Sequence, residues 1–402
     1  MPAAHRSRRL ALLQTALVST AFAMQLVISN AINPLLPIYR AQLGLNAVVL
    51  SLTFVLYVGA LVVVLALLAN PRFARHAPAL LLASLVALVA SDLFALHPEP
   101  WSILTARVLV GVAGGLGTGA ASALVVGTIG AAGRSITSTG NIAGAVVGVV
   151  AAQLLVSTVG ADAPGLVFVG HAVLVVVLFI ALAAVLWARR RVNARALEHQ
   201  TASIELGGRQ RLRLPARALP VLVTGSIAWV ALSISVVFSA TIFADLGQPL
   251  VQAVGPALLL VASGILQFAS PALTRVAPWL SGALTLAVGA AAVAAGSFAA
   301  LPVIAVAGLT LIGAGAGVAY RAGLVAFTLG ASSSRQGALA SMYAAVTYAV
   351  AAASALIVGR VSDLIGFGPT AVGAYGLLTL LALLALAWAP RLRDTVEGEP
   401  AP

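Results

Sequence analysis

The chain has 402 residues, of which 61% are hydrophobic and 8% charged, and it carries a formal charge of +12 without a single cysteine. A soluble domain carries about 25% charged residues, so this composition excludes that class, and intrinsic disorder needs the opposite balance. Without cysteine there is no disulfide framework, thiolate nucleophile or sulfur-ligated metal. An integral membrane protein remains, and its length allows about twelve helices of about 20 residues each.

Twelve apolar stretches of spanning length follow one another along the chain. They are too long and continuous for barrel strands of about ten alternating residues. The sequence therefore predicts an all-α polytopic membrane protein with twelve transmembrane helices. The expected spans are 11–38, 47–69, 78–96, 102–130, 138–159, 165–188, 218–244, 250–272, 278–299, 303–329, 338–359 and 368–389.

The second half of the chain repeats the first. The loop Ala69-Asn70-Pro71 with Arg75 recurs as Ala269-Ser270-Pro271 with Arg275, an offset of 200 residues. We therefore expect two pseudo-symmetric six-helix bundles, a design typical of transporters. The expected domains are an N-terminal bundle at 1–188, a basic cytoplasmic linker at 189–217 that could contact acidic lipid headgroups, and a C-terminal bundle with a short cytoplasmic tail at 218–402.

Arginine placement predicts the orientation. All 22 basic residues are Arg; eighteen lie at one set of span ends and only two, Arg40 and Arg360, at the opposite set. Because cytoplasmic loops are enriched in basic residues, both termini and the linker should be cytoplasmic. We expect a multi-pass protein of a bacterial cytoplasmic membrane. The arginines are spread over short loops, so we expect no nucleic-acid partner.

The fourth span carries Arg107-x-x-x-Gly111-x-x-Gly114-Gly115-x-Gly117. This string is similar to the R-x-x-x-G pattern of the major facilitator superfamily, which the chain resembles from about residue 10 to 390. The drug-efflux-like branch is the most similar in overall character. The resemblance implies a rocker-switch secondary transporter with one cavity between the bundles.

The chain departs from the family pattern in three places. The cytoplasmic loop motif is eroded at 66–75, where Asn70 stands for an Asp. A better match, Gly359-Arg360-Val361-Ser362-Asp363, lies on the opposite predicted side of the membrane. The fifth span has Gly144 and Gly148 but lacks the proline that exporters often show there. These glycines, like those of the fourth and tenth spans, fit close helix packing.

The first and second halves each carry polar side chains that could face a substrate. The polar residues of the first span share one helical face, which suits either a cavity or hydrogen bonds between helices. Trp229 could offer a stacking surface, or could simply pack. The candidate cavity residues are Gln25, Ser29, Asn30, Asn33, Trp229, Ser235, Ser239, Gln267, Arg321 and Tyr348.

Ionisable residues within the spans are costly and often functional. Asp92 is the sole carboxylate inside a span and His171 the sole histidine. Either could handle protons, or cap and hydrogen-bond structurally. Arg107 could form a structural or gating ion pair or take part in transport, whereas Arg321 could contact substrate, snorkel or lock a helix. Asp92, Arg107 and His171 are the candidates for coupling or gating.

The sequence shows no nucleophile–base pair, phosphate loop or metal cluster, so we expect no enzyme activity, metal or cofactor. We expect a monomeric secondary transporter that moves a small organic molecule by alternating access, with protons as coupling ion and membrane lipids as surroundings. Export by antiport is the favoured direction. The alternatives are an importer or exchanger of organic anions and, in another class, a non-transporting lipid-handling or sensor protein.

Overall fold

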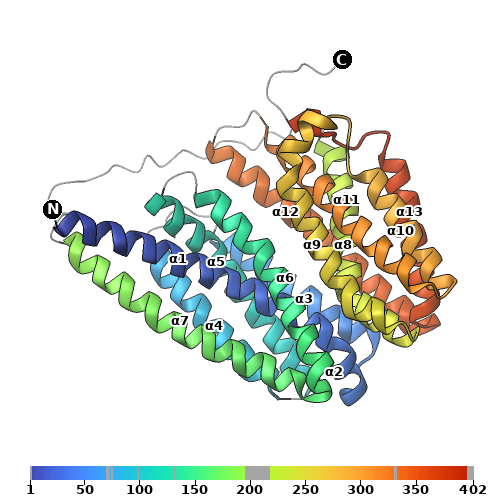
Figure 1. The fold of residues 1–402 in the computed structure, drawn as a ribbon, viewed down its shortest axis with the longest axis horizontal. Helices are drawn as coiled ribbons and strands as arrows, with labels where there is room; N and C mark the ends of the chain where they lie inside the picture. Colours follow the sequence, from blue (N-terminus) through green and yellow to red (C-terminus); the bar gives the residue numbers. More distant parts are fainter. Residues whose placement is uncertain are drawn as a thin grey trace. The chain divides into compact units, whose positions relative to one another are not determined.

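The computed structural model describes residues 2–68, 73, 76–97, 99–129, 133–194, 218–329 and 333–395. Within those residues all regular structure is helical (Figure 1). Among the described residues, ten stretches are long and apolar enough to cross a membrane. One of them, Ala143–Arg189, holds two helices joined by a turn, and the further apolar helix Ala283–Phe298 is shorter. The predicted class, an all-α polytopic membrane protein, is confirmed, with a helix at each expected span.

The chain divides into two compact units, Met1–Ile32 with Leu56–Gly208 and Asn33–Val55 with Arg209–Pro402. The division falls within α3 (Ala47–Leu67). The first unit otherwise contains α1 (Pro2–Ala31), α4 (Ala77–Ala95), α5 (Pro100–Ile129), α6 (Gly133–Val159), the short turn η4 (Gly160–Asp162) and α7 (Ala163–Ala194). The second contains η1 (Asn33–Leu35), α2 (Leu36–Leu43), α8 (Ala218–Asp245), α9 (Pro249–Val276), α10 (Ala283–Phe298), α11 (Pro302–Thr328), α12 (Ser333–Ile365), α13 (Phe367–Ala385) and η6 (Leu392–Thr395).

The linker expected from the sequence begins before helix α7 ends. Of the expected linker at 189–217, the first residues continue α7 to Ala194, and 195–217 lie outside the described residues. The compact units differ from the expected bundles in one respect, because Asn33–Val55 groups with the second half of the chain. The bundles at 1–188 and 218–402 remain our prediction.

The first span is interrupted, which the continuous apolar run did not reveal. Helix α1 ends at Ala31, the 3-10 turn η1 starts at Asn33, and α2 follows from Leu36. Pro34 explains the break, since proline has no N–H to donate and its ring clashes with the preceding turn of a helix. Similarly, α10 starts only at Ala283, after Gly282 in the left-handed conformation (φ 76°), rather than at the expected residue 278.

The two units repeat one packing pattern. In the first, α1 packs against α5, α6 and α7, while α4 packs against α5 and α7. In the second, α8 packs in the same way against α11, α12 and α13, while α10 packs against α11 and α13. Helices α1 and α8 are thus the central helices of their units. The internal repeat expected from the sequence is present in the packing.

Glycines make the repeat visible at the level of single contacts. A Cβ on Gly111 of α5 would overlap the carbonyl oxygen of Tyr57 on α3, and a Cβ on Gly313 of α11 would overlap that of Leu259 on α9. Gly313 lies 202 residues after Gly111, and Leu259 lies 202 residues after Tyr57, so the two contacts are equivalent in the repeat. Side chains larger than hydrogen are excluded because the helix backbones touch, as is common between membrane helices.

The outer faces of the helices suit a lipid environment. On α7, the exposed side chains include Val173 (57%), Leu174 (60%), Val177 (61%) and Ile180 (62%). An apolar surface of this kind would be a liability in water, but in a bilayer it meets hydrocarbon of equal polarity. The buried faces therefore carry most of the polar groups considered below.

We expect Gly313→Ala to lower the stability of the protein by about 1–3 kcal/mol, the usual cost of overpacking, because the added methyl meets the backbone of α9. Gly376→Ala on α13 is the matched control, since nothing lies within 4 Å of its Cβ position. Helix propensity alone should make that control neutral or more stable by up to about 1 kcal/mol. Melting of the detergent-purified variants measures both. Equal melting temperatures would show that α9 and α11 do not depend on this contact.

The predicted orientation can be tested because the chain has no native cysteine. Ala161→Cys lies in the exposed turn between α6 and α7, and Val276→Cys lies at the exposed end of α9. The arginine distribution places these ends on opposite sides. Only Ala161→Cys should react with a membrane-impermeant thiol reagent on intact cells, and both should react after permeabilisation. Labelling of both from outside would contradict the twelve-span topology.

Candidate functional site

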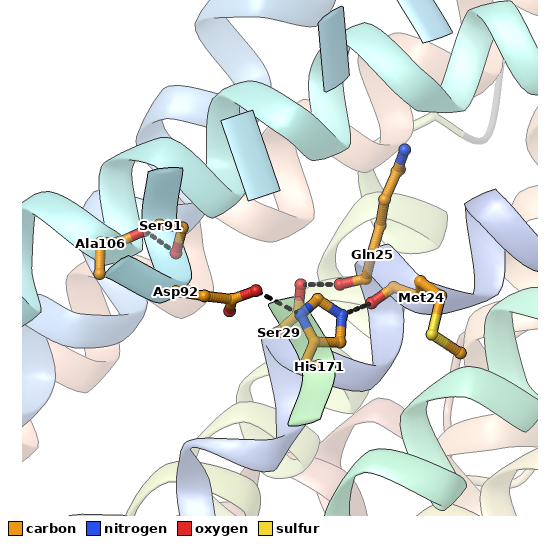
Figure 2. Close-up of polar contacts among 7 residues, drawn as sticks. All are labelled: Met24, Gln25, Ser29, Ser91, Asp92, Ala106 and His171. Atoms are coloured by element: carbon orange, nitrogen blue, oxygen red, sulfur yellow. Dashed lines mark hydrogen bonds and ion pairs between the residues drawn. The ribbon is translucent and has the colours of Figure 1, made fainter. Parts of the chain in front are cut away.

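Asp92 on α4 and His171 on α7 lie together inside the first unit, 79 residues apart in the sequence. His171 Nδ1 lies 2.7 Å from Asp92 Oδ2, and the two side chains are 4% and 0% exposed (Figure 2). The other ring nitrogen, Nε2, lies 3.1 Å from the backbone carbonyl oxygen of Met24 on α1. One imidazole therefore connects three helices.

The surroundings of this pair are short of hydrogen-bond donors. Asp92 Oδ1 is buried and has no hydrogen-bond partner among the described residues. The adjacent Ser91 hydroxyl donates to the carbonyl oxygen of Ala106 on α5 instead, 2.9 Å away. A buried ionised carboxylate needs partners for its oxygens, because it has lost the hydration that water provides. The site thus favours states in which the pair carries no net charge.

Arg107 on α5 reaches the same stretch of α1 from another side. Its guanidinium donates to the carbonyl oxygen of Ser29 at 3.2 Å and lies over the ring of Tyr57, 4.8 Å from the ring centroid. The residue is only 4% exposed. Cation–π contact and a charge-assisted hydrogen bond both stabilise a buried guanidinium. Arg107 therefore joins α1, α3 and α5.

The polar face of α1 makes contacts within its own unit. Gln25 is buried and its amide donates to the Ser84 hydroxyl on α4 at 2.9 Å. The Ser29 hydroxyl and the Asn30 amide donate to carbonyl oxygens one turn earlier in α1. Asn33, also buried, lies in η1 and so belongs to the second unit. Whether any of these four candidates contacts substrate stays a prediction.

The second unit holds an aromatic cluster made of Trp229 on α8, Tyr320 on α11, and Tyr343 and Tyr348 on α12. Trp229 stacks on Tyr348 with ring centroids 4.7 Å apart and lies 5.1 Å from the centroid of Tyr320. The indole N–H is buried and has no hydrogen-bond partner among the described residues. The rest of the Trp229 side chain is only partly buried. The cluster thus offers an aromatic surface with one unused donor.

The two serine candidates of α8 have different surroundings. Ser235 accepts a hydrogen bond from the Tyr375 hydroxyl on α13 at 3.1 Å, so it joins two helices. Ser239 is completely buried, and its hydroxyl has no partner among the described residues. Neither lies at an exposed surface. Ser235 has a structural contact, while Ser239 keeps hydrogen-bonding capacity unused.

Arg321 on α11 is partly buried and contacts α9. Its guanidinium donates to the Ser270 hydroxyl at 2.5 Å, and that hydroxyl donates to the backbone oxygen of Gln267 at 2.9 Å. The Gln267 amide in turn donates to Ser263 at 3.2 Å. No carboxylate pairs with Arg321 among the described residues. A guanidinium has five N–H donors, so Arg321 retains capacity for an anionic group.

The structure adds residues that sequence reasoning did not single out. Ser84, Tyr57, Ser270 and Tyr320 each contact a candidate residue. Serine and tyrosine are common in membrane helices, and nothing in their spacing shows which helix they face. Among the described residues, no group of three or more His, Asp or Glu side chains could hold a metal ion.

The family model that describes the Major Facilitator Superfamily matches residues 12–348, well over half of the chain. The chain belongs to the Major Facilitator Superfamily. It is therefore a multi-pass secondary transporter and not an enzyme. The match specifies the superfamily and not a branch of it, so the drug-efflux-like branch stays a prediction.

Solved structures with the same fold belong to proteins named as transporters of different substrates. The nucleoside transporter NupG matches with TM-score 0.68 and 14% identity over 94% of this chain and 98% of its own. A D-xylose–proton symporter matches with TM-score 0.69 and 14% identity over 96% and 98%. The peptide transporter POT in complex with sulfate matches with TM-score 0.66 and 18% identity over 96% of each chain. Identities this low show the fold alone, and no curated protein matches the chain.

Proposed function

We propose that this transporter moves a small organic molecule with a flat ring and a hydrogen-bond acceptor across the bacterial cytoplasmic membrane, by alternating access and as an exporter coupled to protons. The observation that carries the substrate class is the buried, unpartnered indole N–H of Trp229 within an aromatic cluster. An aromatic platform binds a flat ring through its face, and a single donor then orients the ligand.

The energetic argument concerns the cost of leaving the indole N–H unsatisfied. A buried donor without an acceptor costs about 1–3 kcal/mol, which a ligand oxygen or nitrogen would recover on binding. The rings of Tyr320 and Tyr348 hold Trp229 in place before any ligand arrives. Preorganisation of this kind lowers the entropic cost of binding.

Coupling to protons and the outward direction are two further parts of the proposal. The fold is shared with a D-xylose–proton symporter, so proton coupling occurs within this fold. Export is proposed from the overall resemblance of the sequence to the drug-efflux-like branch. Both termini on the cytoplasmic side and a monomeric state complete the proposal.

A second candidate substrate class is the organic anion, taken up or exchanged. Arg321 favours it, because its guanidinium is held by a neutral hydroxyl and by no carboxylate among the described residues. Paired, charge-assisted hydrogen bonds from a guanidinium suit a carboxylate or phosphate group.

We expect Trp229→Phe to weaken ligand binding by about 0.5–1.5 kcal/mol, roughly twofold to twelvefold, because it keeps a ring but removes the N–H donor. A panel of small cyclic compounds is first screened by thermal shift on the purified wild-type protein, since a bound ligand raises the melting temperature. Hits are then tested for flux in proteoliposomes, where a protonophore should abolish accumulation.

Trp279→Phe is the matched control, because Trp279 is 64% exposed and lies outside the cluster. It should bind every hit with wild-type affinity. If Trp229→Phe also binds each hit as tightly as the wild type, the aromatic cluster is not the substrate site. Hits that bind without flux would favour a sensor over a carrier.

Arg321 separates the two substrate classes. If the substrate is an anion held by the guanidinium, Arg321→Ala should abolish flux and Arg321→Lys should impair it, since lysine keeps the charge but loses the planar pair of donors. Both variants should insert into the membrane at near-normal levels. Wild-type flux of an anionic substrate in Arg321→Ala would remove the second candidate.

A further inference from the structure

We infer that Asp92 and His171 together form the proton-binding site of this transporter, and that the structure holds this site with its proton bound. The inference rests on the proposed function in that it names the residues that would couple protons to substrate movement. It is carried by the two contacts of one buried imidazole.

The contact with Met24 fixes one proton. A backbone carbonyl oxygen can only accept a hydrogen bond, so the 3.1 Å contact from His171 Nε2 requires a proton on Nε2. A bare ring nitrogen facing that oxygen would be repelled by it. One proton of the site is therefore committed to the bond with α1.

The contact with Asp92 requires a second proton. Nδ1 and Oδ2 are 2.7 Å apart, which is a hydrogen-bond distance and needs one proton between them. That proton belongs either to an imidazolium facing a carboxylate or to a carboxylic acid facing a neutral imidazole. Both descriptions give the same proton count and no net charge, so the proton is shared by the two side chains.

Loss of one proton must break one of the two contacts. If Nδ1 is left bare, it faces the Asp92 carboxylate as a second acceptor and the link from α7 to α4 is lost. If Nε2 is left bare, it faces the Met24 carbonyl oxygen and the link from α7 to α1 is lost. The released proton goes to water at one face of the membrane. Proton release thus changes how α7 is held.

The charges around the pair support this assignment. Among the described residues of α1, α4, α5, α6, α7 and η4, the only other charged side chain deep within a span is Arg107, which donates to Ser29 on α1. Arg9 lies in the first third of α1, Arg189 in the last quarter of α7 and Asp162 in the short turn η4. Among the described residues of this unit, the other carboxylates, Glu99 and Asp162, lie in the turns between helices. The unpartnered Asp92 Oδ1 disfavours an isolated negative charge at the pair.

The contacts also place the site where it can act on α1. His171 holds the carbonyl oxygen of Met24, Ser84 holds the next side chain, Gln25, and Arg107 holds the carbonyl oxygen of Ser29. Three helices thus fix a turn and a half of α1. A change in one of the three contacts alters the restraint on the central helix of the unit.

The first experiment measures protons and needs no substrate. Histidine-labelled protein in lipid nanodiscs is titrated between about pH 5 and pH 8, the range in which a histidine switch must work, and the nitrogen signals of His171 are followed by NMR. His171→Gln assigns the signals. We expect a protonation step at His171 that is absent from Asp92→Asn, because the amide can still donate to Nδ1 but cannot release a proton. His171 signals that do not change across this range would overturn the inference.

The second experiment measures coupling with a compound found in the thermal-shift panel. A pH gradient of one unit can drive accumulation of about tenfold for one proton exchanged. Asp92→Asn should lose this accumulation while keeping exchange of substrate against substrate, which needs no net proton movement. His97→Gln, an exposed histidine of the same unit, is the control and should accumulate normally.

The outcomes separate the two proposals. If the wild type moves no compound of the panel, the proposed substrate class fails, and the NMR titration still decides the proton site. If the wild type is driven by the pH gradient and Asp92→Asn accumulates substrate equally well, transport stands and the assignment of Asp92 and His171 is wrong.

Discussion

Direct contact between helix backbones is the constraint on which both units depend. Lipid is as apolar as leucine, so helices in a membrane are not driven together by the hydrophobic effect and must gain from packing and hydrogen bonds. The glycines of α5 and α11 permit this contact at equivalent places, against α3 and α9. Gly144 and Gly148 of α6 do the same against the carbonyl oxygens of Ala23 and Val27 on α1. Close approach then brings polar groups on neighbouring helices within hydrogen-bond reach.

That closeness explains why so many candidate residues have protein partners. Gln25 meets Ser84, Arg107 meets Ser29 and Asp92 meets His171, each across a helix–helix contact of the first unit. A polar group in a span needs such a partner, because hydrocarbon supplies none. The groups that lack one are therefore informative. Two such groups are the indole N–H of Trp229, a buried donor without an acceptor, and Oδ1 of Asp92, a buried acceptor without a donor, among the described residues.

The fold was largely predictable from the sequence, whereas the pairing of the site residues was not. Apolar length alone predicted a helix at every span, and a nearly constant offset predicted the repeat that Gly111 and Gly313 now show in space. The interruption after Ala31 was missed because Asn33 and Pro34 sit within an apolar run, although the proline carried the signal. Asp92 and His171 were each identified as ionisable groups within spans. Their contact depends on how α4 and α7 are rotated, which hydropathy does not report.

The helices of the two units repeat, but the titratable and aromatic side chains discussed above do not. At the offset of 202 residues, Asp92 and His171 correspond to Ala294 and Gly373, which cannot titrate. Trp229 and Tyr348 correspond in the other direction to Val27 and Val146, which cannot stack. The proposed proton site therefore belongs to the first unit and the proposed substrate site to the second. Proton and substrate then do not compete for one set of side chains. Coupling between them then requires two conformations of the protein. Each ligand must bind one conformation more tightly than the other, so that binding of either shifts the same equilibrium.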